Sequence, residues 1–140
     1  MHRLQVSFRG QEGYRVIRHC VNEYIKQTLG SKCAAMVIAF NEAVNNAIQY
    51  GGRSGAGTVT VKFRLLKGKR LIIRVKDSGA GFAAAGAYCQ AAKAPLRFED
   101  IAWSESGRGV FLMKAIADYV IYNKCGNEVL LMKRVPGETG

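Results

Sequence analysis

One short stretch of the chain places an acid beside several amides, in the sequence Asn41-Glu-Ala-Val-Asn-Asn-Ala-Ile48. Glu42 and Asn46 are four residues apart, so in a helix they lie one turn above the other on the same side. A helix with an acid and amides on one side could build a ligand site. For this helix alone a solvated polar face is the more common outcome, so the interpretation depends on the rest of the chain.

A second stretch places a carboxylate at the end of a predicted strand. Counting by two along the alternating pattern from Leu71 reaches Asp77, which therefore has core-side parity. Burial disfavours a carboxylate charge, so an acid at this position needs a reason, and contact with a ligand is one. Gly79 and Gly81 follow at once and permit a tight turn and a close approach of a ligand to the backbone.

A third stretch is a glycine-rich helix start at Gly107, Arg108 and Gly109. Backbone N–H groups at such a start can hold phosphate oxygens, and Arg108 adds a permanent positive charge. Neither the dinucleotide fingerprint nor the pattern G-x-x-x-x-G-K-[ST] is present in the chain. Each of the three stretches is a weak signal when it is taken alone.

The elements that must position these residues begin with a helix predicted over residues 34–52. It is rich in helix-forming residues and ends at a Gly pair. Its apolar side is made of Met36, Val37, Phe40, Val44, Ala47 and Ile48. Its opposite side carries Glu42, Asn45, Asn46 and Gln49.

The remaining patterns predict a strand over 3–8, a helix over 11–29, and a hairpin with arms 58–66 and 70–76. Residues 83–106 lack periodicity, which suggests a mobile cover over a site. An amphipathic helix over 106–118, with Phe111, Leu112, Ala115 and Ile116 inward, precedes strands at 119–123 and 129–135.

These elements predict an α+β fold, a two-layer α/β sandwich. About three helices would cover one face of a mixed, mostly antiparallel sheet. With 140 residues, the chain is expected to form a single domain over 1–140. Lys62, Arg64, Arg74 and Lys76 would share the outer face of the sheet, where a solvated surface is more probable than a nucleic-acid platform.

Composition narrows the class of protein. Lys and Arg number 21 against 10 Asp and Glu, a net charge of +11, which favours an anionic partner. No apolar run approaches the ~20 residues that span a membrane, and the N-terminus lacks the apolar core of a signal peptide. The four cysteines are scattered and are expected to be reduced thiols, so we expect a cytoplasmic protein without a membrane partner.

Taken in order, the three stretches resemble the ATP-binding boxes of the GHKL superfamily, which has the Bergerat fold and includes gyrase, heat-shock chaperones, histidine kinases and mismatch-repair ATPases. The matching patterns are Glu42-x-x-x-Asn46-Ala47, Asp77-x-Gly79-x-Gly81-Phe82 and Gly107-x-Gly109. The sequences of residues 41–48 and 107–118 look like those of bacterial anti-sigma-factor serine kinases of partner-switching systems. The likeness covers nearly the whole chain.

The resemblance implies roles for the matching residues. Glu42 would be the general base, and Asn46 would coordinate a Mg²⁺ ion that bridges the phosphates of ATP, since an amide oxygen suits a hard cation. Asp77 would accept a hydrogen bond from the adenine amino group, and Asn45 would also line the nucleotide site. The glycine-rich residues expected to follow the nucleotide and close on its phosphates are Gly79, Gly81, Gly107, Arg108 and Gly109.

The resemblance also implies a reaction and partners. The γ-phosphoryl group of ATP would pass to a serine of a STAS-domain anti-anti-sigma protein, and the chain, a homodimer, would sequester a sigma factor. An ATP-binding regulator that holds a partner without kinase turnover is the alternative. The catalytic domain of a histidine kinase is a weaker hypothesis, because the chain has no room for a phospho-acceptor domain. Direct nucleic-acid binding is weaker still.

Overall fold

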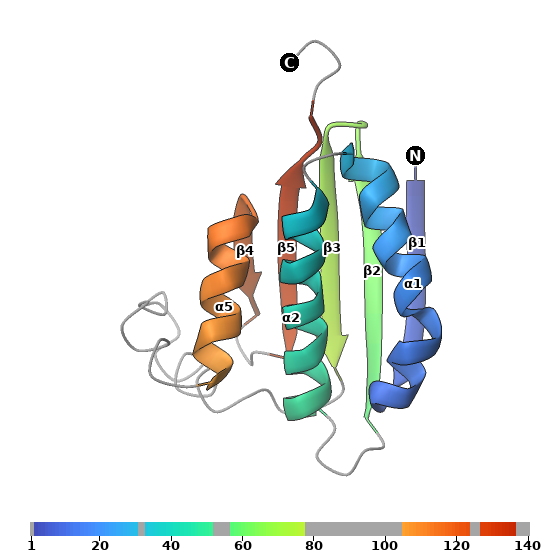
Figure 1. Ribbon diagram of the computed structural model, residues 1–140, viewed down its shortest axis with the longest axis vertical. Coiled ribbons are helices and arrows are strands. Elements are labelled where there is room, and N and C mark those ends of the chain that lie inside the picture. Colours follow the sequence, from blue (N-terminus) through green and yellow to red (C-terminus); the bar gives the residue numbers. More distant parts are fainter. Residues whose placement is uncertain (1, 31–32, 52–56, 78–104, 124–126, 137–140) are drawn as a thin grey trace.

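The computed structural model describes residues 2–30, 33–51, 57–77, 105–123 and 127–136. These residues form two layers, in which three helices cover one face of a five-stranded sheet (Figure 1). The elements in chain order are β1 (His2–Arg9), α1 (Gly10–Leu29), α2 (Cys33–Gly51), β2 (Thr58–Leu66), β3 (Arg70–Asp77), α5 (Glu105–Ile116), β4 (Tyr119–Tyr122) and β5 (Glu128–Arg134). The predicted α+β sandwich is confirmed.

The sheet has the strand order β1-β2-β3-β5-β4. All four pairings between the described strands are antiparallel, so the expectation of a mixed sheet was wrong for this part of the chain. The β2–β3 hairpin turns at Lys67 and Gly68, which have φ of 54° and 66° and so bend the chain through the left-handed region. This hairpin register places Asp77 opposite Val59 at the far end of the pair.

The core lies between the helices and the inner face of the sheet. Strand alternation buries Val59, Val61 and Phe63 on β2, as the sequence pattern predicts. Helix α2 lies over the middle of the sheet, and its Phe40 ring packs 5.5 Å from the ring of Phe63. The predicted apolar side of α2 is confirmed, because its members are all buried or half-buried.

The predicted inward face of α5 was wrong. Val110, Met113 and Ala117 are buried, whereas Phe111 and Leu112 remain 48% and 39% exposed. Of the four residues predicted inward, Ile116 is half-buried and Ala115 is exposed. Helix α5 packs against α2, and the buried stripe continues from Gly109, where the two helices approach closely. The small Gly109 permits this close approach, and Val110 and Met113 are the apolar side chains of α5 that it brings into the core.

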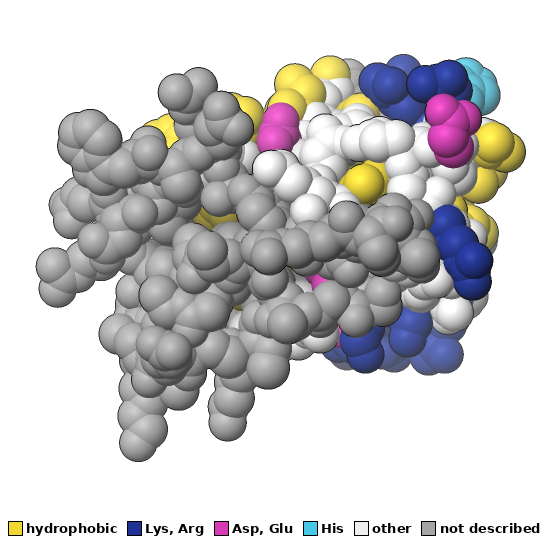
Figure 2. All heavy atoms as spheres, turned by 90° about the horizontal axis from the view of Figure 1, so that it is seen from below, with side chains coloured by type: hydrophobic (Ala, Val, Ile, Leu, Met, Phe, Trp, Pro, Cys, Tyr) yellow, Lys and Arg dark blue, Asp and Glu magenta, His cyan; other side chains and the backbone are white. Residues whose placement is uncertain are grey.

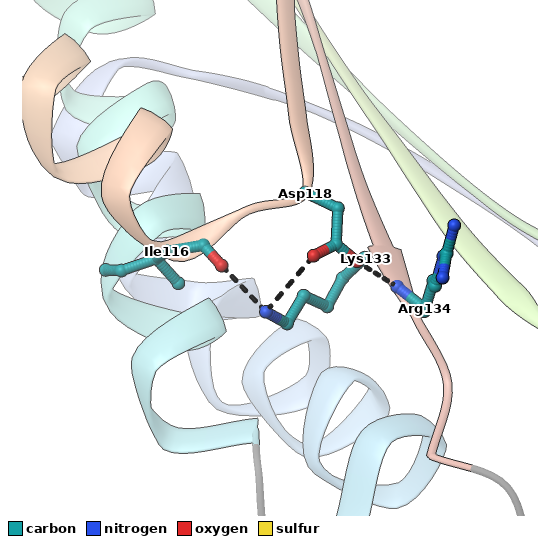
Figure 3. A network of polar contacts seen from close by, with 4 residues as sticks. All are labelled: Ile116, Asp118, Lys133 and Arg134. Atoms are coloured by element: carbon teal, nitrogen blue, oxygen red, sulfur yellow. Dashed lines mark hydrogen bonds and ion pairs between the residues drawn. The ribbon is translucent and has the colours of Figure 1, made fainter.

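The C-terminal end of α5 is fastened to β5 by a polar network (Figure 3). Lys133 Nζ donates a hydrogen bond to the Ile116 carbonyl at 2.8 Å and lies 3.7 Å from Asp118 Oδ1. The other Asp118 oxygen accepts a hydrogen bond from the Arg134 backbone N–H at 2.7 Å. A cation at a helix C-terminus also interacts favourably with the carbonyl dipoles there. This network fixes where α5 lies relative to the sheet.

Candidate functional site

The polar side of α2 is only partly exposed to solvent. Asn46 is only 8% exposed and Glu42 is half-buried, while Asn45 and Gln49 remain exposed. The Asn45 side-chain oxygen accepts a long hydrogen bond of 3.5 Å from Gln11 of α1. Glu42 and Asn46 are thus partly shielded from water. A ligand bound to them would also be partly shielded.

Gly109 of α5 lies directly on these two side chains. A Cβ atom added at Gly109 would be 2.9 Å from Glu42 Oε2 and 3.3 Å from Asn46 Nδ2. The first distance is shorter than real Cβ contacts, so any larger residue would displace the carboxylate. The structure therefore brings the first and third sequence motifs together, and it explains why the third motif needs glycine at this position.

Asn46 also faces the sheet. Its Nδ2 atom is buried and has no hydrogen-bond partner of ordinary geometry among the described residues. Buried polar atoms are usually paired, so an unpaired one suggests a ligand or an ordered water. Asn46 lines a small hollow together with Tyr122 of β4 and Asn127.

Tyr122 joins Asn46 to the second motif. Burial raises the pKa of the Tyr122 phenol well above its usual value, the neighbouring Asn46 amide opposes this change, and the charge of Asp77 adds to it. Tyr122 is therefore neutral at physiological pH and lies close to both residues. Sequence reasoning missed it, although the alternation of residues 119–123 places Tyr122 on the same side as the inward Val120.

Asp77 is the last residue of β3 and is only 6% exposed, which confirms its predicted core-side parity. Its backbone N–H donates a hydrogen bond of 2.9 Å to the Asn127 carbonyl, next to β5. A carboxylate has two oxygens that can accept several hydrogen bonds, and at this strand end one of these could come from a ligand.

A family model described as histidine kinase-like ATPase domain matches residues 11–133. The chain belongs to this family. The match includes all three motifs and every described element except β1. A comparison with curated proteins finds no match.

ATP is therefore the nucleotide of this histidine kinase-like ATPase domain. The residues present fit a metal-bound phosphate group, because the sheltered Asn46 amide, whose Oδ1 is the atom that can coordinate a cation, lies with the Glu42 carboxylate beside Gly109. Mg²⁺ in phosphoryl-transfer sites takes few protein ligands and completes its shell with phosphate oxygens and water. Among the described residues there is no cluster of three or more His, Cys, Asp or Glu side chains.

Part of the predicted site lies outside the described residues. Gly79, Gly81 and most of the expected cover over 83–106 belong to this part, while residues 105–106 are the start of α5 and not irregular chain. The backbones of Gly107 and Arg108 lie in the first turn of α5, and the Arg108 side chain is not described. None of the described helices is long and apolar enough to cross a membrane.

Proposed function

We propose that this chain is an ATP-dependent serine kinase of a partner-switching system. It would transfer the γ-phosphoryl group of ATP to a serine of a STAS-domain antagonist and, as a homodimer, sequester a sigma factor. The observation that supports this most strongly is the contact of Gly109 with both Glu42 and Asn46. That contact places a general-base candidate and a cation-ligand candidate at the start of a helix whose backbone N–H groups can receive phosphate.

Each residue has a task in this reaction. Glu42 accepts the proton of the incoming serine hydroxyl, because it is the carboxylate at the α2–α5 contact. Asp77 accepts a hydrogen bond from the adenine amino group at the other end of the nucleotide. Asn46 holds the Mg²⁺ ion, which when bound neutralises charge on the phosphates. Catalysis then rests on positioning and electrostatics, as is usual for phosphoryl transfer.

The test is transfer of labelled phosphate from ATP to a STAS-domain protein from the same genome. We expect phosphoserine with the wild type, and a loss of about 10²-fold to 10⁴-fold in Glu42→Gln, which keeps the shape but not the basicity of the side chain. Glu23→Gln is the control, because Glu23 lies on α1, where its half-exposed side chain pairs with Lys26. Its transfer rate should equal that of the wild type.

ATP binding is measured in parallel by calorimetry. Glu42→Gln should bind ATP as the wild type does, because Glu42 acts on the acceptor hydroxyl. Full transfer by this variant would refute the assigned role of Glu42. If the wild type binds ATP and captures its partner in an ATP-dependent way but never yields phosphoserine, the protein is the non-transferring regulator.

A further inference from the structure

The outer face of the sheet, opposite the helices, is divided into two parts. The strand register places Arg3, Lys62, Arg64, Arg74 and Lys76 side by side on β1, β2 and β3, and we call these residues the basic half. Figure 2 shows one group of Lys and Arg side chains at the right of its lower edge, away from the helices, and others at its right edge and upper right. This arrangement confirms that the hairpin cations share one surface.

The basic half is arranged at a cost to the fold. Lys62 lies directly opposite Arg74 in the β2–β3 register, and like charges in opposed positions are destabilising. The ion pairs found among the described residues involve Arg15, Lys26 and Lys133, and none includes a member of this half, although Glu128 of β5 lies opposite Lys76 in the register. Arg3, Lys62, Arg64 and Arg74 instead surround a shallow hollow of about 460 Å³. Unneutralised cations around a hollow can receive several negative charges at once.

An apolar strip, Tyr119, Ile121 and Leu130, continues the same face on β4 and β5. Tyr119 is 58% exposed and Ile121 is 55% exposed, and Leu130 is half-buried. Leu130 pairs with Ile121 on one side and with Arg74 on the other, so the strip adjoins the basic half without a gap. Adjacent exposed apolar side chains are typical of a surface that another molecule covers.

We propose that this composite face binds an acidic partner protein, which covers the apolar strip with apolar side chains and presents carboxylates to the basic half. A second copy of this chain fits this face poorly, because it would present the same row of cations to its twin. A nucleic acid would leave the apolar strip uncovered, and the basic half contains no aromatic side chain for base stacking.

The proposed surface lies on the face of the sheet opposite α2, and it comes nearest to the nucleotide site at its Lys76 end, where a second hollow is lined by Lys62, Arg74 and Lys76 together with Asp77 and Glu128. The sheet lies between it and α2, so a partner held here is remote from Glu42 and is not the molecule that receives phosphate (Figure 1). This inference goes beyond the proposed kinase reaction and does not depend on it. It predicts a partner that stays bound while ATP occupies the site.

The first test uses a fluorescent peptide with a run of Glu followed by Leu and Phe, and a matched peptide with Gln in place of Glu. Binding to the full chain is followed by fluorescence anisotropy in about 0.15 M salt. We expect the Glu peptide to bind at least tenfold more tightly than the Gln peptide. Equal affinities for the two peptides would overturn the proposal.

The second test uses variants of each half. Lys62→Glu/Arg74→Glu should weaken the Glu peptide at least tenfold, and the milder Lys62→Gln/Arg74→Gln serves if the first variant unfolds. Tyr119→Ser/Ile121→Ser should weaken it about fivefold or more. Arg15→Glu/Arg18→Glu on α1 makes the same charge change elsewhere and should alter the affinity less than threefold.

Three results would overturn the proposal. An equal loss of affinity for the Glu peptide in Arg15→Glu/Arg18→Glu would show that binding depends only on the net charge of the chain. Tighter binding of a single-stranded or duplex DNA of similar charge, unaffected by Tyr119→Ser/Ile121→Ser, would assign the face to nucleic acid. A change from dimer to monomer in the apolar variant, measured by light scattering, would assign the face to a second copy. ATP affinity should be the same in every variant.

Discussion

Replacing Gly109 by alanine tests the contact on which the site depends. The added Cβ would lie 2.9 Å from Glu42 Oε2, which is about 0.5 Å short of the 3.4 Å at which ordinary contact begins. The nearest atom is the end of a flexible side chain, so Glu42 can retreat without a change of backbone. The substitution therefore moves the carboxylate and leaves the fold in place.

The two expected effects have opposite signs. Alanine favours a helix over glycine by up to about 1 kcal/mol, so the free energy of unfolding should stay constant or rise slightly. Because misplacement by about 1 Å can cost about 10²-fold in rate, a shift of half that size should slow phosphoryl transfer about tenfold. A variant that is as stable as the wild type but slower is the signature of a displaced catalytic group.

The assay compares transfer of labelled phosphate with thermal unfolding of the same preparations. Gly13→Ala is the matched control, because its Cβ would lie 3.1 Å from Phe8 Cβ, within the β1–α1 contact and away from Glu42. Gly13→Ala should change the free energy of unfolding and leave the rate of phosphoryl transfer unchanged. If Gly109→Ala transfers phosphate at the full rate, Glu42 is not held by α5 as described, and the reasoning fails.

Three further predictions concern other contacts. Asn46→Ala should lower the affinity for ATP about tenfold or more when Mg²⁺ is present and much less when it is absent. Replacing the exposed Gln49 by alanine should change neither affinity. Calorimetry with and without Mg²⁺ measures both affinities. Burial raises the pKa of Tyr14 from 10.0 to about 12, so the neutral phenol contributes stability below pH 10 that is lost as the pH rises towards 12. Between pH 10 and 12, the free energy of unfolding of Tyr14→Phe, measured with denaturant, should fall less steeply than that of the wild type. Lys133→Met removes the hydrogen bond to the Ile116 carbonyl, and chemical denaturation should show a loss of about 1 kcal/mol; unchanged stability would mean that this anchor of α5 is not needed.

Much of the fold could be predicted because local patterns and the tertiary structure agree. Strict alternation along β2 and β3 specifies which side chains face the helices, and the same count placed Asp77 in the buried position that the structure shows. On α2, apolar residues at helical spacing meet the sheet as expected. Each of the three motifs that carry the family resemblance is a short run of neighbouring residues, so it can be recognised without the fold.

The features that could not be predicted depend on contacts between elements. The rotation of α5 is accompanied by the close approach at Gly109, whereas the sequence pattern favours burial of the larger Phe111 and Leu112. Tyr122 was missed because it comes from a short strand at the edge of the sheet, and only the strand order brings it near Asn46. Neither relation is encoded in a window of neighbouring residues.

Two parts of the candidate site flank the chain segment 78–104, and each is bonded to the scaffold beside β5. Before that segment, the Asp77 backbone is bonded to Asn127 beside β5. After it, α5 is tied to β5 through Lys133 and Asp118, so its first turns are carried on a helix with a fixed far end. The Glu42–Asn46–Gly109 contact is thus set by the scaffold outside 78–104. We therefore expect substitutions within 78–104 to change affinity for nucleotide or partner without displacing the catalytic pair.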